Sequence, residues 1–496
     1  MSLARRAIAA VSWNLGTNLL KVAVLLARAI LLARLLPVET FGVYALATAI
    51  VTLSGILPQW GMGSAFLHRA PQTADEGHAA AVHFTLRLAL TAVWLAALLA
   101  LVVWLAEGAL RVALITLALV FAGLYLVDTP KAILVRRVQH RRLALLDLLT
   151  AVATTVAAVA LAARGYGLWA LLATDVVALA LAVVAFYLWR PVWRPRLLWA
   201  GDTVRYYLRF GSRAMTESAL SEALDNLDDL WTGSYLGAHA LGLYSRAYTF
   251  ATYPRRLLAM PVNAVAGGTY AELKGDRPGL SRAFFRTNAL LVRSGFLLGG
   301  LLVLVAPEFT RLALGERWLP MVPAFRLMAV FTLLDPIRVT VSSLFVAVGR
   351  PEQVVRVRLV QLAAMVVGLF ALGSRWGITG VALVVDGVLL IGLGWLLGRA
   401  RPYVDFSARR LFGAPLLALI AGAAAALGGM WLACRAAPGV CGNDWLSGGV
   451  KGVAFVVVFG GLLLALERDE VVQMIRFIRK KEDEPQITQI SQIQES

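Results

Sequence analysis

Polar and cationic side chains recur on one side of the first apolar stretch of the sequence. Asn14, Asn18, Lys21 and Arg28 are separated by four, three and seven residues, so they fall on a single stripe of an α-helix. Cationic and amide groups attract anions, and arginine can hold a phosphate through paired hydrogen bonds. The spacing therefore predicts an anion site along this stripe.

An acidic stripe occupies the corresponding place later in the sequence. The positions 200 residues after the cationic stripe include Asp225 and Asp228, and Glu222 precedes them on the same side of a helix. We predict an ion-coupling or gating role for these three carboxylates. They either bind a coupling cation, proton or sodium, or pair with the cationic stripe, in which case the offset sets Asp228 opposite Arg28.

Three further arginines, Arg87, Arg246 and Arg255, lie inside or beside apolar stretches and complete the predicted substrate-binding set. An ionisable group in an apolar medium is costly unless it has a partner or a water-filled cavity. The alternative to substrate binding is that each forms a structural ion pair, or that its long side chain reaches an interface. The sequence leaves both interpretations open.

Metal and catalytic sites are not expected. The five histidines lack the spacing of a metal site or a catalytic triad, and two cysteines, Cys434 and Cys441, are too few for a structural zinc site. These cysteines either form a disulfide within one small loop or remain free thiols. We therefore expect a protein that is not an enzyme and that needs no cofactor.

The elements that carry these residues are membrane helices. Of the 496 residues, 59 % are hydrophobic and only 15 % are charged, and the mean hydropathy is +0.74. A soluble domain has no means of covering so much apolar surface. Fourteen spans are predicted, near 8–33, 41–66, 79–105, 109–130, 143–164, 167–189, 208–236, 240–268, 287–306, 320–348, 355–374, 377–398, 412–432 and 446–466.

Positive charge alternates between the connections of these spans. From the fourth onward, every even-numbered connection contains several Lys or Arg residues, whereas most odd-numbered ones are short and poor in them. Because cytoplasmic loops are the positive ones, both termini are predicted to lie in the cytoplasm. Topology thus accounts for the net charge of +18, and without a nucleic-acid-binding motif we exclude nucleic acid as a partner.

An internal repeat relates the two halves of the chain. The segment LPVETFGVYALAT at 36–48 returns as LGAHALGLYSRAY at 236–248, which superposes Gly42 on Gly242 and Tyr44 on Tyr244, and a second echo relates Asp175 to Asp386. Such echoes indicate a duplicated six-helix unit with both copies in the same orientation. We predict an all-α polytopic membrane protein of about fourteen helices, in which two parallel six-helix repeats form two lobes around a central cavity.

The predicted domains follow from this repeat. They are an N-terminal lobe at 1–200, a C-terminal lobe at 201–400, helices 13 and 14 at 401–468, and a cytoplasmic interfacial helix with a disordered tail at 469–496. Pro58, Pro254 and Pro261 lie inside predicted spans, where proline removes a backbone hydrogen bond. These prolines mark candidate bends.

Four short motifs occur in the order expected of a known family. They are LLARLLPVETFGVYALA at 31–47 with GMGSAFLHR at 61–69, LDNLDDLWTGSYLGAHALGLYSRAY at 224–248, LGERWLPMVPAFRLMA at 314–329, and AVGRPEQ at 347–353. The chain thereby resembles the Wzx-type exporters, the O-antigen and exopolysaccharide flippases of the multidrug, oligosaccharidyl-lipid and polysaccharide (MOP) exporter superfamily. Within them it is most similar to the colanic-acid exporter branch.

The resemblance implies a flippase of the bacterial inner membrane. Such a protein moves an undecaprenyl-pyrophosphate-linked oligosaccharide to the outer leaflet by alternating access, for O-antigen, capsule or exopolysaccharide biosynthesis. It implies a polyprenyl-pyrophosphate-linked glycan and the lipid bilayer as partners, together with a polysaccharide polymerase and a chain-length regulator. By this resemblance the pyrophosphate meets Lys21 and Arg28.

Three alternatives remain open. A cation-coupled multidrug antiporter of the same superfamily shares the twelve-span core but not the additional pair of spans. A membrane enzyme such as a polymerase or ligase usually has a large external loop, and this chain has none. A scramblase or a purely structural membrane protein leaves the cationic stripe unexplained.

Overall fold

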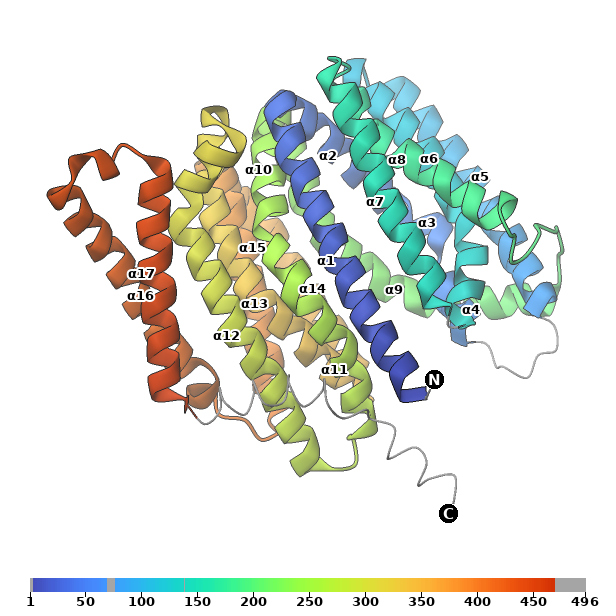
Figure 1. Ribbon diagram of the computed structural model, residues 1–496. Coiled ribbons are helices and arrows are strands. Elements are labelled where there is room, and N and C mark those ends of the chain that lie inside the picture. The colour runs from blue at the N-terminus through green and yellow to red at the C-terminus, as the bar shows by residue number, and fades with distance from the viewer. Residues whose placement is uncertain (1–2, 69–75, 138, 469–496) are drawn as a thin grey trace. The chain divides into compact units, whose positions relative to one another are not determined.

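The computed structural model describes residues 3–68, 76–137 and 139–468, in which all regular elements are helices (Figure 1). Of residues 3–17 only the backbone is described. The predicted interfacial helix and tail at 469–496 lie outside the described residues, so they stay a prediction.

The described residues of the first half of the chain form eight α-helices. They are α1 (Leu3–Leu35), α2 (Val38–Ser54), α3 (Ile56–Gln59), α4 (Met62–His68), α5 (Glu76–Leu105), α6 (Gly108–Arg136), α7 (His140–Ala163) and α8 (Leu168–Val183). A short π-helical turn at Val184–Leu188 extends α8.

Up to residue 468, the second half forms nine α-helices. They are α9 (Gly201–Trp231), α10 (Gly237–Ala251), α11 (Met260–Glu272), α12 (Arg277–Phe309), α13 (Val322–Ala347), α14 (Pro351–Gly368), α15 (Ser374–Ala400), α16 (Ala408–Ala436) and α17 (Asp444–Leu466). Short π or 3₁₀ segments occur at Thr232–Leu236, Arg255–Ala259, Thr310–Leu314, Glu316–Met321, Leu369–Gly373 and Pro438–Val440.

A helix occupies each stretch that the sequence predicts as a span, which confirms the all-helical, polytopic class. Ten helical stretches of the described chain are long and apolar enough to cross a membrane. The ten do not include α1, α9 or the α10–α11 pair, which carry most of the ionisable residues singled out above. Residues Pro351–Ala400, which were predicted as two spans, count as one of the ten. The number of crossings, fourteen, therefore stays a prediction.

Two of the predicted spans are interrupted where they contain proline. The second predicted span is divided into α2, α3 and α4, with Pro58 in the short α3. The eighth is divided into α10 and α11, and a π-helical turn at Arg255–Ala259 lies between Pro254 and Pro261. The missing N–H of each proline prevents the ladder of main-chain hydrogen bonds from running unbroken. The predicted bends are thus present.

The contacts divide the chain into two compact units. Unit one comprises residues 1–22, 247–357 and 389–496, and unit two comprises residues 23–246 and 358–388. The boundaries pass through α1, α10, α14 and α15, and α9 packs within unit two against α2, α4 and α5. The lobes predicted to meet at residue 200 and to end at residue 400 therefore remain a prediction.

Unit one is built around α12. The hairpin of α16 and α17 packs against α12, drawn in orange and red beside the yellow helix in Figure 1. Gly300 of α12 and Gly422 of α16 both lie against the ring of Phe455 of α17, where a larger side chain would overlap it. Ion pairs join α12 to the ends of α17, from Arg293 to Glu467 at 2.7 Å and, nearer the start, from Glu308 to Lys451 at 2.5 Å.

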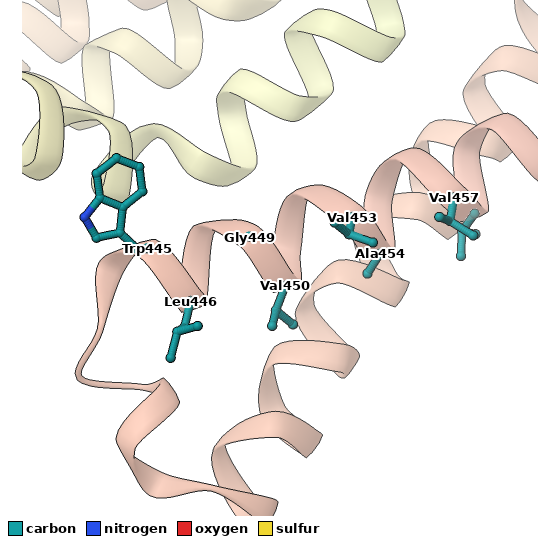
Figure 2. A pocket seen from close by; sticks show the side chains of 8 residues that line it. Trp445, Leu446, Gly449, Val450, Val453, Ala454 and Val457 are labelled. Carbon is teal, nitrogen blue, oxygen red and sulfur yellow. The ribbon is translucent and has the colours of Figure 1, made fainter.

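The outer side of α17 carries an apolar groove of about 600 Å³. Trp445, Leu446, Val450, Val453 and Val457 line it (Figure 2). Exposed aliphatic side chains with a tryptophan at one helix end are typical of a surface in contact with lipid. At that end of the hairpin, Cys434 and Cys441 form a disulfide, which decides between the two possibilities that the sequence left open.

Two of the apolar clusters in the described part of unit two hold the helices around α9 and α5 together. Trp94, Leu117 and Val51 join α2, α5 and α6, while Phe66 and Tyr207 join α4 to α9. The hydroxyl of Tyr207 donates a hydrogen bond of 3.1 Å to the carbonyl of residue 79 in α5. The beginning of α9 is therefore anchored beside α4 and α5.

Candidate functional site

The cationic stripe lies on one unbroken helix, α1. The side chain of Asn14 lies outside the described residues, while those of Asn18, Lys21 and Arg28 are half-buried. Arg28 Nη1 donates a hydrogen bond of 3.0 Å to Thr154 Oγ1 of α7. Within the described chain no carboxylate forms an ion pair with Arg28, so its charge is not neutralised by direct contact.

A second hydrogen bond lies near Arg28. Tyr44 of α2 donates to Asp175 Oδ2 of α8 at 2.7 Å, and Thr174 contributes a further hydrogen bond to the same oxygen at 3.3 Å. Arg28 is close enough to Asp175 to act on it electrostatically. Four helices, α1, α2, α7 and α8, thus bring a cation, a carboxylate and three hydroxyl groups together inside an apolar bundle.

The three acidic residues of α9 that the sequence singled out have different environments. Asp228 is buried, with Oδ2 accepting a 2.5 Å hydrogen bond from Tyr244 of α10, and its Oδ1 has no hydrogen-bond partner in the described chain. Asp225 is exposed. Glu222 is half-buried and accepts from Asn226 at 3.2 Å. Only Asp228 combines burial with an unused acceptor.

The pairing of Asp228 with Arg28 suggested by the repeat offset is not formed in this structure. Asp228 is held by Tyr244, and Arg28 by Thr154. The repeat offset identifies equivalent helices. It cannot show that hydroxyl groups from other helices lie closer to Asp228 and to Arg28 than these two residues lie to each other. The assignment of the two stripes to substrate and ion binding stays a prediction.

The two repeat-related tyrosines have similar partners. Tyr44 and Tyr244 each donate a hydrogen bond to a carboxylate, Asp175 and Asp228 respectively. These carboxylates are not equivalent in the repeat, because the counterpart of Asp175 is Asp386. Asp386 is 8 % exposed, and its Oδ1 has no hydrogen-bond partner in the described chain.

The starts of α2 and α10 cross in a reciprocal contact inside unit two. A Cβ on Gly42 would overlap the main-chain carbonyl at residue 238, and a Cβ on Gly242 would overlap the carbonyl of Val38. Glu39 Oε1 lies 2.6 Å from His239 Nδ1 beside this crossing. We call these residues the glycine crossing. The backbone approach explains why glycine is required at both repeat-related positions.

Arg246 lies next to the glycine crossing. Its guanidinium carbon is 4.5 Å from the centre of the Phe41 ring, a cation–π distance. The role of Arg246 in substrate binding stays a prediction, and its neighbour Phe41 could not be expected from the sequence alone.

Arg87 has a structural environment. It is 3 % exposed, forms an ion pair with Asp128 of α6, and donates hydrogen bonds to the carbonyls of Pro58, Gln59 and Tyr125. Two of these carbonyls belong to α3, whose interruption leaves them without helical partners. These contacts favour the structural alternative for Arg87, and we do not include it in the proposed ligand site.

Arg255 belongs to a three-residue cluster in unit one. Asp335 of α13 has a fully buried carboxylate, with Arg255 at 2.6 Å and Arg338 at 2.7 Å. Two cations on one carboxylate leave a net positive charge. Arg338 was not among the predicted ligands, although its position three residues after Asp335 on one helix was a signal for the pair.

Together these features define a class of protein: a helical membrane protein with charged residues inside its apolar bundle. Among the described residues no group of three His, Cys, Asp or Glu side chains is arranged to hold a metal ion. Polar residues within such helices mark substrate or ion pathways when they are not structural.

The family model described as "Polysaccharide biosynthesis protein" matches residues 31–323. This match covers more than half of the chain, so the protein belongs to that family. The match extends from the end of α1 to the beginning of α13 and includes the acidic stripe and the glycine crossing.

Curated relatives agree with this membership. The chain is 26 % identical to the succinoglycan biosynthesis transport protein ExoT of Rhizobium meliloti over 79 % of this chain and 81 % of that protein. It is 28 % identical to the lipopolysaccharide biosynthesis protein WzxC of Escherichia coli over 41 % of this chain and 40 % of WzxC. The match to the teichuronic acid biosynthesis protein TuaB of Bacillus subtilis has 26 % identity and spans 34 % of TuaB.

Solved structures define the fold. The lipid II flippase MurJ in an inward closed conformation has a TM-score of 0.72 and 12 % identity over 94 % of this chain and 99 % of that chain. An inward-facing multidrug resistance MATE transporter of the MOP superfamily has a TM-score of 0.60 and 16 % identity over 77 % of this chain and 95 % of that chain. The chain therefore has the helical fold that these two solved structures represent.

Proposed function

We propose that this protein is a flippase for a lipid-linked oligosaccharide. It moves a polyprenyl-pyrophosphate-linked repeat unit from the cytoplasmic to the outer leaflet of the bacterial inner membrane, for O-antigen, capsule or exopolysaccharide biosynthesis. The observation that carries the proposal is Arg28, a cation inside the bundle with a hydroxyl partner and no ion-paired carboxylate in the described chain. Membership of a polysaccharide biosynthesis family supports this substrate class.

The chemistry of the substrate fits the cationic residues. A pyrophosphate group is expensive to bring into an apolar bundle unless cations and hydrogen-bond donors replace its water. We assign this role to Lys21 and Arg28, with Asn14 and Asn18 as polar neighbours on α1. The net positive cluster of Arg255, Asp335 and Arg338 is a second place where an anionic sugar or phosphate can bind. The polyprenyl tail remains in lipid throughout.

Asp228 is the proposed coupling residue. Its buried carboxylate has one oxygen held by Tyr244 and the other without a hydrogen-bond partner in the described chain, so a proton or a sodium ion would satisfy it. Glu222 and Asp225, on the same helix, are proposed to guide the cation toward Asp228. A cation bound here favours one conformation and supplies the differential affinity that transport requires.

The proposed setting follows the basic connections and the family. Both termini lie in the cytoplasm, and the polymerase and the chain-length regulator act on the translocated unit as partners on the outer side. The name of ExoT, a succinoglycan biosynthesis transport protein, supports a transport role rather than catalysis.

A multidrug antiporter is the second candidate, and the MATE fold similarity favours it. The two functions differ in what is moved. Proteoliposomes carrying the purified protein should move a polyprenyl-pyrophosphate-linked oligosaccharide between leaflets, measured by its accessibility to a glycosidase outside. Transport of cationic drugs without movement of the lipid-linked sugar would establish the antiporter instead.

The anion site can be tested in cells that depend on this protein for surface polysaccharide. Arg28→Ala should reduce export by at least about tenfold, because a charge-assisted contact to phosphate is worth ~1.5–3 kcal/mol. Arg34→Ala, at the exposed last turn of the same helix, is the matched control and should export normally. Membrane abundance of each variant is measured by immunoblot.

Two results would contradict the assignment. Normal export by the Lys21→Ala, Arg28→Ala double variant would show that the stripe does not hold the pyrophosphate. Loss of the Arg28→Ala protein from the membrane would show that Arg28 is a packing residue bound to Thr154.

A further inference from the structure

A pocket of about 470 Å³ lies in unit one between the beginning of α12 and the beginning of α16. Arginine side chains form much of its wall, namely Arg282 and Arg286 of α12 and Arg410 of α16. By the proposed topology this end of both helices faces the cytoplasm. None of its lining residues belongs to the cationic stripe of α1 or to the Asp335 cluster.

The pocket carries an excess of positive charge. Asp405 is its only acidic lining residue, and it forms an ion pair of 2.7 Å with Arg277. In the described chain no carboxylate pairs with Arg282 or Arg286, both of which are exposed. The forked donors of arginine are fully used by an anion that accepts two parallel hydrogen bonds, and two oxygens of one phosphate group can do so.

The rest of the lining is suited to an amphipathic ligand. Arg410 stacks on Phe285 with its guanidinium carbon 5.4 Å from the ring centre. Phe406 also lines the pocket and packs with its ring centre 5.7 Å from that of Phe284. Aromatic rings and arginine side chains therefore line the same pocket. This combination suits the glycerol region and the headgroup of a lipid.

The main chain adds to the same electrostatic preference. Ser407 is the N-cap of α16 and accepts a hydrogen bond from the amide of Arg410. The start of this 29-residue helix, where its partial positive charge lies, borders the pocket through Ser407 and Arg410. Helix start, arginines and aromatic rings therefore favour the same ligand.

We propose that this pocket binds the phosphate headgroup of an anionic phospholipid of the inner leaflet. Its position at the predicted cytoplasmic interface places it at headgroup depth, where basic residues attract anionic lipid. The bound lipid would fasten the α16–α17 hairpin to α12 from the cytoplasmic side. This inference does not depend on which substrate is transported.

The test uses the full-length protein in detergent with dioleoyl-phosphatidylglycerol as the probe and dioleoyl-phosphatidylcholine as the neutral comparison. Native mass spectrometry should detect preferential retention of phosphatidylglycerol. The double variant Arg282→Gln with Arg286→Gln keeps polar side chains at both positions and removes both charges. It should weaken binding by at least about tenfold. Arg194→Gln with Arg196→Gln, two exposed arginines of another predicted cytoplasmic connection, is the matched control and should bind normally.

Equal losses in the two double variants would overturn the proposal, because binding would then follow total charge alone. Inorganic phosphate and pyrophosphate form a further arm: either ion binding as tightly as the lipid would overturn the lipid assignment. A photoactivatable phosphatidylglycerol gives a readout in the unmodified protein. It should label segments 281–286 and 405–410, and labelling confined to other segments would also refute the proposal.

Discussion

Asp228 and its tyrosine partner lead to a prediction about single atoms. Asp228→Asn removes the charge that a coupling cation would neutralise while keeping the acceptor for Tyr244. We expect transport by this variant to continue at a rate reduced by about tenfold or more and to be insensitive to the proton or sodium gradient. Transport is measured in proteoliposomes with imposed gradients.

The control for this prediction compares the two repeat-related tyrosines. Tyr44→Phe removes the hydroxyl bound to Asp175, and Tyr244→Phe removes the one bound to Asp228. Only Tyr244→Phe should alter the ion concentration that gives half-maximal transport. If Asp228→Asn keeps full activity and unchanged ion dependence, Asp228 is a packing residue.

Arg87 gives a prediction about stability. Its side chain satisfies carbonyls of the interrupted α3 and pairs with Asp128. Arg87→Ala should lower the free energy of unfolding by about 1–3 kcal/mol, since the carbonyls of Pro58 and Gln59 lose their hydrogen-bond donor. The measurement is the loss of fluorescence-detected monodisperse protein on heating.

Arg87→Lys is the companion variant, because lysine keeps the charge but cannot reach several carbonyls at once. An Arg87→Ala protein of normal thermal stability that fails to export would return Arg87 to the ligand site.

Some of the helix interruptions could be predicted from the sequence and others could not. Apolar length predicted a helix at every span, and Pro58, Pro254 and Pro261 predicted the two bends. The left-handed backbone of Trp60, with φ of 43°, had no comparable signal, because tryptophan has no preference for that conformation. The close approach of Gly61 to Gly211 that accompanies it depends on packing between α9 and the α3–α4 turn.

The candidate site was predictable by residue type and not by partner. Charges in apolar helices are conspicuous, so Lys21, Arg28 and Asp228 could be selected from the sequence. Thr154 and Tyr244 could not, since hydroxyl residues are common in such helices and carry no charge signal. The Arg255–Asp335 contact joins residues that are 80 positions apart in the sequence, and only the tertiary structure reveals it.

The crossing of α2 and α10 gives a prediction at the level of elements. Gly42→Leu or Gly242→Leu inserts a side chain where a main-chain carbonyl lies, so the two helix ends must separate. Because these ends are predicted to face outward, each variant should open that end. Thiol labelling of a cysteine at Glu39 should rise several-fold in Gly42→Leu.

Gly63→Leu is the matched control, since nothing lies within 4 Å of a Cβ there. Conversely, Glu39→Cys with His239→Cys should be joined by a short bifunctional thiol reagent, and transport should stop until the link is cleaved. Unimpaired transport by the cross-linked protein would exclude movement at the crossing.

The topology is a prediction about the whole molecule. In a variant lacking Cys434 and Cys441, cysteine at Gln139 or Arg194 should be shielded from an impermeant thiol reagent in intact cells. Cysteine at His239 should be labelled, because the positive connections lie inside. Labelling of position 139 from outside would overturn the arrangement of fourteen spans.

The glycine crossing also constrains how the sequence can change over time. At each glycine the obstacle is the partner's main chain, which no substitution in the partner can remove. A genetic screen for second-site suppressors of Gly42→Leu should therefore recover no compensating change at Ala238. Suppressors should instead fall at residues that determine the paths of α2 and α10, such as those in the turns that precede the two helices. The two halves of this duplicated chain must therefore retain Gly42 and Gly242 together.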